Sequence, residues 1–192
     1  MVDIEHRLNA VEEIIKKPSF RENKGLSNEV GYYVFDYPAD QELAVRERIK
    51  KIAKKHEKGT YGFKLVIFDL YEVIISMLEE KKFLEKCFDF EKTKGFSHIT
   101  KSIESAFRFS GEKNLLVEYI KENTPDNSVV FLTGIGKCYP ILRSHNILNN
   151  LHQVMDKVPV VMFYPGKYDG QELILFSELK DHNYYRAFRL VD

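Results

Sequence analysis

The stretch Val129-Val130-Phe131-Leu132-Thr133-Gly134-Ile135-Gly136 is the most informative part of the sequence about the fold, because it leads from a predicted strand towards a predicted helix within a short span. The unbroken run of apolar and β-branched residues predicts a buried strand that ends at Thr133. The two glycines then provide a tight exit, and Pro140 is placed to open a helix near its first turn. A fully apolar strand followed directly by a helix is typical of a parallel sheet covered on both faces.

The same alternation extends in both directions along the chain. We expect further strands at 31–37, 63–68 and 159–164, a strand-like stretch at 173–176 and a closing strand at 185–191. Helical spacing of apolar residues is found at 8–15 and 45–56. The loop 165–170 is too short for a helical crossover, so the strands beside it should be antiparallel. The predicted fold class is therefore α/β: three layers, with a mostly parallel sheet flanked by helices and an antiparallel C-terminal edge.

Between about 71 and 124 the sequence predicts helices and no strand. Apolar residues form helical clusters there, with breaks expected at 93–95 and 110–111. The stretch is several times longer than the roughly dozen residues that a parallel crossover needs, so we interpret it as a helical insertion packed beside the sheet. At 192 residues the chain fits a single domain spanning 1–192.

Charge and cysteine content argue against several classes of protein. Lys+Arg and Asp+Glu both number 29, and a formal net charge of zero disfavours a general nucleic-acid coat or a binder of acidic membranes. Cys87 and Cys138 are too few and too far apart for a disulfide framework or a zinc site. No run approaches the ~18 apolar residues of a membrane helix, and the charged start lacks a signal peptide's apolar segment. We therefore expect a cytoplasmic protein.

Polar residues mark the expected carboxyl ends of three strands, where ligands collect in open α/β sheets. These residues are Asp36, Asp69 and Thr133. Two carboxylates at neighbouring strand ends could together hold a magnesium ion. Asp69 also begins a D-x-x-E capping box, and Asp36 can accept backbone amides in the turn that follows it. We favour these structural roles over a metal site.

The segment after Thr133 lies where a phosphate-binding loop would follow its strand. Gly136 and Lys137 fit such a loop, but Phe131 takes the place of its first glycine and Cys138 that of its metal-binding hydroxyl. ATP hydrolysis is therefore not expected, although backbone amides at the helix start could still seat an anion. The candidate ligand-binding set at the strand ends is Asp36, Asp69, Thr133, Gly134, Gly136 and Lys137.

A polar stripe is predicted on the helix that follows this loop. Arg143, His145, Asn149 and His152 share it, and the spacing of the last three places them on one face. No carboxylate or cysteine completes a metal shell there. We interpret the residues Arg143, His145 and Asn149 as a polar interaction face.

The clearest basic cluster lies on the 45–56 helix and just beyond it. Its lysines lie on the side of the helix opposite the apolar stripe. We interpret them as a solvated helix face, with weak DNA contact as the alternative. They are Lys50, Lys51, Lys54, Lys55 and Lys58.

Several longer motifs resemble the BrxB family of the BREX phage-defence systems of bacteria and archaea. The strongest are 132–151 (LTGIGKCYPILRSHNILNNL), 158–170 (VPVVMFYPGKYDG) and 183–189 (NYYRAFR), and shorter ones are 26–30 (LSNEV), 33–37 (YVFDY) and 68–71 (FDLY). The resemblance covers nearly the whole chain and is weakest over the helical middle. Gly31 and His152 depart from the family pattern, which has proline and glutamine there.

The resemblance implies a role more than a mechanism. BrxB proteins are encoded beside a BrxC-like ATPase, a PglX-like methyltransferase and a PglZ-like protein of the alkaline-phosphatase type, and the family has no assigned catalytic residues. We therefore expect a non-enzymatic subunit of a BREX complex, without a cofactor or metal, whose direct partner is the PglZ-like protein. The candidate partner anchors are Tyr164, Tyr168, Tyr184, Tyr185, Arg186 and Arg189. A nucleotide- or magnesium-dependent enzyme and a DNA-contacting accessory protein are the alternatives.

Overall fold

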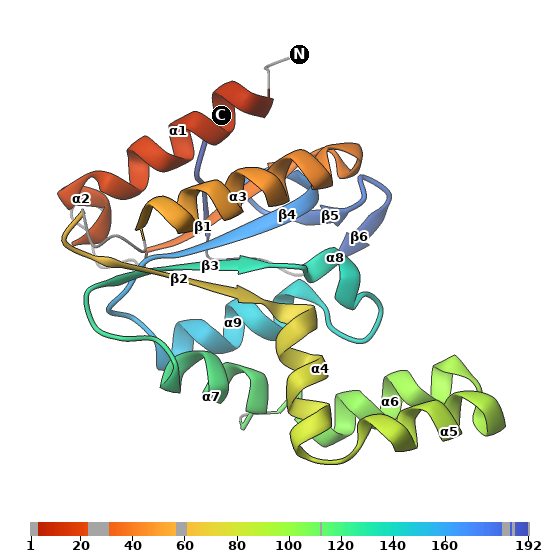
Figure 1. Cartoon of the computed structure of the whole chain (residues 1–192). Helices are drawn as coiled ribbons and strands as arrows, with labels where there is room; N and C mark the ends of the chain where they lie inside the picture. The colour runs from red at the N-terminus through yellow and green to blue at the C-terminus, as the bar shows by residue number, and fades with distance from the viewer. Residues whose placement is uncertain are drawn as a thin grey trace.

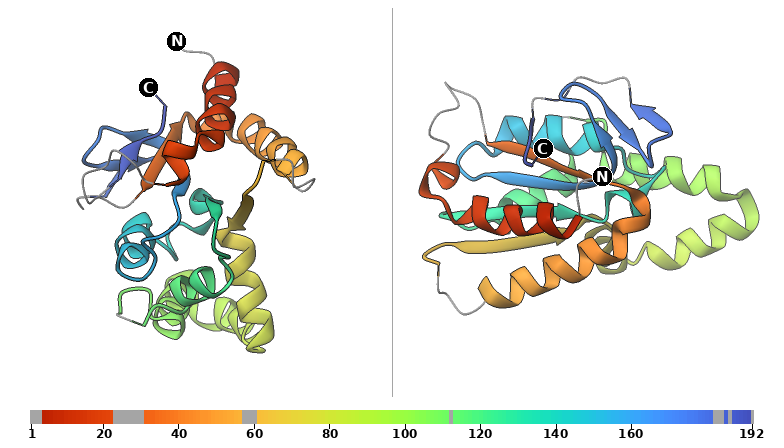
Figure 2. Two further views of the ribbon diagram at one scale, coloured as in Figure 1. Left: turned by 90° about the vertical axis from the view of Figure 1, so that its left-hand side faces the viewer. Right: turned by 90° about the horizontal axis from the view of Figure 1, so that it is seen from above.

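A central sheet between two layers of helices forms the body of the protein (Figure 1). The computed structural model describes residues 4–22, 31–56, 61–111, 113–181, 185 and 187–191. Helices α1 and α3 cover one face of the sheet, and α4, α7 and α9 lie on the other (Figures 1 and 2). The predicted three-layer α/β class is confirmed.

The main sheet is parallel and has the strand order β2-β3-β4-β1-β7. The strands are β1 (Tyr32–Tyr37), β2 (Lys64–Asp69), β3 (Ser128–Thr133), β4 (Val160–Tyr168), β5 (Leu173–Leu175), β6 (Leu179–Asp181) and β7 (Phe188–Arg189). The far end of β4 leaves the parallel sheet and pairs antiparallel with β5, which pairs in turn with β6. The antiparallel pairing predicted for the strands beside the loop 165–170 is confirmed, but the bounds of the loop differ: residues 165–168 belong to β4, and the connection to β5 is 169–172.

The first helical layer comes from the N-terminal part of the chain. It consists of α1 (Ile4–Lys16), the short α2 (Pro18–Arg21), a 3-10 turn (Ala39–Gln41) and α3 (Glu42–His56). Its apolar stripes pack on the side chains that strands β1, β3 and β4 turn to this face, such as Phe35, Phe131 and Phe163. The buried carboxylate of Glu12 also joins α1 to α3, because it pairs with Arg48 at 3.0 Å and with Lys55 at 2.9 Å.

The second helical layer includes the segment between β2 and β3. Its helices are α4 (Leu70–Glu80), α5 (Leu84–Lys94), α6 (Phe96–Phe107), α7 (Leu115–Glu122), α8 (Ile135–Cys138) and α9 (Ser144–Val154). The breaks at 93–95 and 110–111 fall where the sequence predicts them. Helices α5 and α6 form an antiparallel pair that projects beyond the sheet (Figures 1 and 2). None of the helices in the described ranges is long and apolar enough to cross a membrane.

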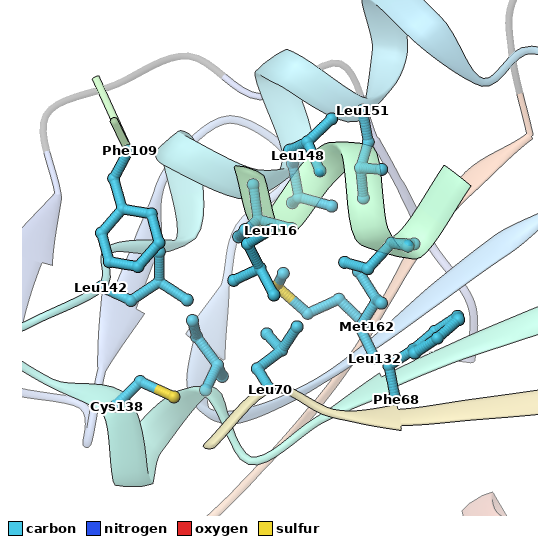
Figure 3. Close-up of a cluster of buried hydrophobic side chains, with 14 of the residues drawn as sticks. Phe68, Leu70, Phe109, Leu116, Leu132, Cys138, Leu142, Leu148, Leu151 and Met162 are labelled. Atoms are coloured by element: carbon cyan, nitrogen blue, oxygen red, sulfur yellow. The ribbon is translucent and has the colours of Figure 1, made fainter. Parts of the chain in front are cut away.

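The larger core lies between the sheet and this second layer. Figure 3 shows Phe68, Leu132 and Met162 from three neighbouring strands facing side chains of α7 and α9. Successive residues of a strand point to opposite faces, so Phe131 packs on the first layer and Leu132 on the second. The strands of the centre are apolar throughout because both of their faces are covered.

The region after β3 differs from the sequence expectation. One helix with Pro140 in its first turn is predicted, but α8 ends at Cys138 and α9 begins at Ser144. Tyr139 has extended backbone angles, φ −67° and ψ 137°, because the residue before a proline is disfavoured in the helical region. The result is an irregular loop, 139–143, at the carboxyl end of the sheet.

Candidate functional site

The strand-end carboxylates do not form a joint metal site. Asp69 on β2 is aligned with Thr133 on β3, and Asp36 on β1 is aligned with Tyr164 on β4. In the order β2-β3-β4-β1, two strands separate Asp36 from Asp69. The expectation that their strands are neighbours is wrong, because the β1-to-β2 connection crosses the sheet instead of joining adjacent strands. Among the described residues no group of three or more His, Cys, Asp or Glu side chains is placed to hold a metal ion.

Asp69 instead caps α4 and binds the lysine of the glycine loop. Its Oδ1 accepts the backbone N–H of Tyr71 at 3.1 Å and that of Glu72 at 3.3 Å. Lys137 donates to Asp69 Oδ2 at 2.7 Å and to Glu72 at 3.3 Å. Partial burial acts to lower the pKa of Lys137, but these two acidic partners outweigh it and raise that pKa. The cation that a phosphate would need is therefore neutralised within the fold.

The glycine loop is filled by other parts of the chain. A Cβ at Gly134 would collide with the carboxylate of Asp69, and one at Gly136 would lie 2.8 Å from Pro165 and 3.1 Å from Phe176. An anion at Gly134 would meet a like charge, and α8 is only four residues long. The geometry offers no cradle for a phosphate, which weakens the case for a nucleotide enzyme.

The thiol beside this loop is unsuited to nucleophilic chemistry. Cys138 is buried, and burial together with the charge of Asp69 raises its pKa to about 12. The reactive species of a cysteine is the thiolate, which is scarce at neutral pH when the pKa is this high.

The predicted polar stripe of α9 is divided between different environments. Arg143 precedes the helix, His145 borders a surface hollow beside α6, and Asn149 is exposed. The ring of His152 stacks on Tyr32 with the centroids 3.9 Å apart. Arg143 and His145 border the same hollow, whereas His152 packs against the core.

Acidic neighbours neutralise part of the basic cluster on α3. Lys50 pairs with Glu47 at 3.1 Å and Lys55 with the buried Glu12. Lys51 and Lys54 are exposed and have no ion-pair partner in the described ranges, and Lys58 lies outside those ranges. Because acidic side chains neutralise two of the four described lysines, α3 attracts the DNA backbone only weakly.

Three of the candidate anchor tyrosines are buried. Tyr168 donates its hydroxyl to Ala187 O at 2.6 Å, and the hydroxyl of Tyr185 lies 3.2 Å from Ser144 Oγ. The prediction of these two as surface anchors is wrong, because hydrogen bonds satisfy their hydroxyls inside the core. Tyr164 is buried as well but forms part of a pocket floor.

The remaining anchors lie at the C-terminal end of the chain. The guanidinium of Arg189 donates to Tyr168 O and lies 3.6 Å from Asp36. Tyr184 and Arg186 are outside the described residues. Arg189 is therefore engaged within the fold rather than presented to a partner.

A pocket of about 390 Å³, here called the hairpin groove, lies between the β5–β6 hairpin and the 139–144 segment. Its floor consists of buried apolar and aromatic side chains, and its rim carries charged and exposed ones. The lining residues are Ile135, Tyr139, Leu142, Arg143, Ser144, Tyr164, Leu175, Glu178, Leu179 and Lys180. Sequence reasoning identified only Arg143 and Tyr164 of these as site residues, since three distant segments build the groove.

Exposed apolar side chains surround the hairpin groove. Tyr139 is 39% exposed and Leu179 38%, and Phe176, which packs on Gly136, is 39% exposed. On the other side of Arg143 a second hollow of about 450 Å³ is bordered by Phe96, which is 51% exposed. We call the surface formed by these five residues the Arg143 face. Aromatic residues and arginine are the types that contribute most to protein–protein interfaces.

The fold and this surface define the class: a three-layer α/β protein with a groove at the carboxyl edge of its parallel sheet. The sequence model of the family described as BREX protein BrxB matches residues 66–190. A BREX protein BrxB of Bacillus cereus (strain H3081.97) is 49% identical over 189 residues, covering 98% of each chain. Another, of Escherichia coli O9:H4 (strain HS), is 34% identical over 193 residues, covering 100% of this chain and 94% of the relative.

No solved structure matches the protein. The chain belongs to the BrxB family and is therefore a component of a BREX phage-defence system.

Proposed function

We propose that the protein is a non-enzymatic interaction subunit of a BREX antiphage complex and acts by protein–protein contact. The Arg143 face is the main support: it gathers an arginine and four exposed apolar side chains around two hollows. Exposed apolar groups collected in one place, with polar residues between them, are typical of interaction sites.

The environment of the strand-end residues also supports this proposal. Lys137 and Asp69 bind each other, and Asp36 is bound by Arg7 at 2.9 Å and by the backbone N–H of Tyr168 at 3.0 Å. These groups hold secondary-structure elements together, and their use in the fold leaves them little capacity for a substrate. A docking function needs only a shaped and partly apolar surface.

We propose the PglZ-like protein as the direct partner, with the BrxC-like ATPase and the PglX-like methyltransferase as further candidates. Membership of the BREX system supports a partner within this set. The test is to tag this chain, co-express it with each neighbour separately, and separate the products by size exclusion. We expect a stable peak that contains this chain and the PglZ-like protein.

A matched pair of variants links the result to the proposed surface. Tyr139→Ala on the Arg143 face should weaken co-elution, whereas Lys51→Ala, an exposed change on the opposite side of the sheet, should not. Elution of the wild-type chain alone in all three pairings would overturn the proposal.

A further inference from the structure

The β5–β6 hairpin presents a free strand edge to the hairpin groove. Within the described ranges β6 pairs with β5 and with no other strand. Leu179 and Lys180 are consecutive strand residues, so their side chains point to opposite faces of the hairpin. Both nevertheless border the groove. The groove therefore reaches the edge of β6 that lies away from β5.

The hydrogen bonds of the hairpin show which backbone groups are free at this edge. Leu175 O accepts the N–H of Glu178 at 3.1 Å, so the backbone groups of Leu175 face β6. Leu179 is the register partner of Leu175, and its own groups therefore face β5. Backbone groups of successive strand residues alternate in direction, which turns the N–H and C=O of Lys180 outward along the groove.

The groove walls combine an apolar floor with a net positive rim. The floor contains Ile135, Leu142 and Tyr164, each no more than 2% exposed. Of the ten lining residues Arg143 and Lys180 are cationic and Glu178 is anionic. In the part of the chain that the structure describes, neither Arg143 nor Lys180 has an ion pair or a side-chain hydrogen bond. An incoming carboxylate would therefore find a cation that is not already neutralised.

We propose that the hairpin groove binds an extended, acidic segment of the partner protein, which adds as a strand to β6. Its backbone pairs with the N–H and C=O of Lys180, an apolar side chain enters the pocket above Tyr164, and a carboxylate binds Arg143. Strand addition of this kind takes affinity from main-chain bonds and specificity from the side-chain pocket. The inference rests on the proposed interaction function and specifies the chemistry of the segment that this site receives.

Lys180→Pro and Lys180→Ala form a matched pair for the strand-addition step. Both remove the ammonium group, but only proline removes the N–H that faces the groove, and proline is tolerated at an edge where that N–H is not bonded within the sheet. We expect Lys180→Pro to bind the PglZ-like protein about two- to tenfold more weakly than Lys180→Ala, the effect of one lost hydrogen bond.

Charge variants test the acidic character of the segment. Arg143→Glu should weaken binding at least about tenfold, because reversal replaces an attraction by a repulsion, whereas Glu178→Gln should leave affinity unchanged or raise it. Thermal melting of every variant confirms that it is folded. Hydrogen exchange on the wild-type complex gives a readout without mutation, since strand addition should protect the Lys180 amide.

Binding of the wild-type chain tests the proposed interaction function, and binding of the variants tests strand addition at β6. Failure of the wild-type chain to bind any of the three BREX neighbours overturns both. A complex that forms normally with Lys180→Pro and Arg143→Glu, and leaves the Lys180 amide unprotected, overturns the inference alone. A self-associated form of the chain that Lys180→Pro dissociates would identify a second copy as the occupant and also overturn it.

Discussion

Replacing Asp36 with alanine should strongly destabilise the protein, because this carboxylate joins four segments of the chain. Its Oδ1 binds Arg7 of α1 at 2.9 Å, and its Oδ2 accepts the buried N–H of Tyr168 in β4 at 3.0 Å. Arg7 also donates to Asp36 O and to Val191 O, which ties the C-terminal segment to the same point. The side chains of Arg7 and Asp36 are each only 13% exposed.

The expected cost follows from the two partners that lose their acceptor. A buried N–H without an acceptor, here that of Tyr168, costs about 1–3 kcal/mol. Breaking a buried ion pair costs about 3–5 kcal/mol, and the lower end applies because Arg7 keeps two carbonyl acceptors. The costs overlap, so we expect a loss of about 3–4 kcal/mol in the free energy of unfolding. At about 2–4 °C per kcal/mol for a chain of this size, the melting temperature should fall by about 6–16 °C.

Urea denaturation followed by circular dichroism measures this difference directly. The matched control is Lys50→Ala, which removes an ion pair with Glu47 whose side chains are 73% and 62% exposed, and which should cost less than about 0.5 kcal/mol. A double-mutant cycle between Arg7→Leu and Asp36→Ala should give a coupling of about 1–3 kcal/mol. A loss below about 1 kcal/mol for Asp36→Ala would contradict this expectation, because losing the buried carboxylate would then cost no more than losing an exposed ion pair.

Three further outcomes are expected. Burial lowers the pKa of His56, which has no hydrogen-bond partner in the described structure, so the unfolded chain binds a proton at this residue at a higher pH than the folded chain does. Stability should therefore fall as the pH drops below about 6.5, and His56→Phe should flatten this fall in urea denaturation measured across the pH range. Burial raises the pKa of the Cys138 thiol to about 12, so this thiol should resist alkylation at pH 8 in the native protein and react only after unfolding. Rapid alkylation of the native protein would contradict the burial of Cys138. Magnesium and ATP should leave the melting temperature unchanged, because Lys137 is already paired with Asp69. A rise of more than about 2 °C at saturating nucleotide would instead support a nucleotide-binding function.

Features that depend on neighbouring residues could be predicted from the sequence. The cap of α4 by Asp69 involves residues two and three positions away, and the predicted breaks at 93–95 and 110–111 follow from local loss of helical spacing. The break between α4 and α5, at 81–83, was not predicted. The antiparallel pairing follows from the short connection, although the turn lies at 169–172 rather than at the predicted 165–170 because β4 extends to Tyr168. Asp169 stabilises this turn by accepting the N–H groups of Gln171 and Glu172. Each of these signals is complete within one short window.

Features that depend on strand order could not be predicted in the same way. A metal site shared by Asp36 and Asp69 requires β1 and β2 to be neighbours, and the sequence does not show that β3 and β4 lie between them. Strand β6 is three residues long and too short to show an alternating pattern. A buried tyrosine with a satisfied hydroxyl, such as Tyr168, has the same composition signature as an exposed anchor. The hairpin groove combines all three difficulties, because its walls come from segments brought together only by the fold.

The carboxyl end of the parallel sheet is the part of the fold that most favours the proposed docking role. In open α/β proteins that end usually binds a small ligand through free polar groups and loop amides. Here Asp69 and Lys137 neutralise each other, and β4 continues past the edge into a hairpin whose Phe176 covers the glycine loop. The hairpin places Phe176 against Gly136 and at the same time presents a strand edge beside an apolar pocket. The accessible groups here are the backbone N–H and C=O of Lys180, the hairpin groove and Arg143. An extended polypeptide can contact all three at once, which suits this surface to the proposed strand addition.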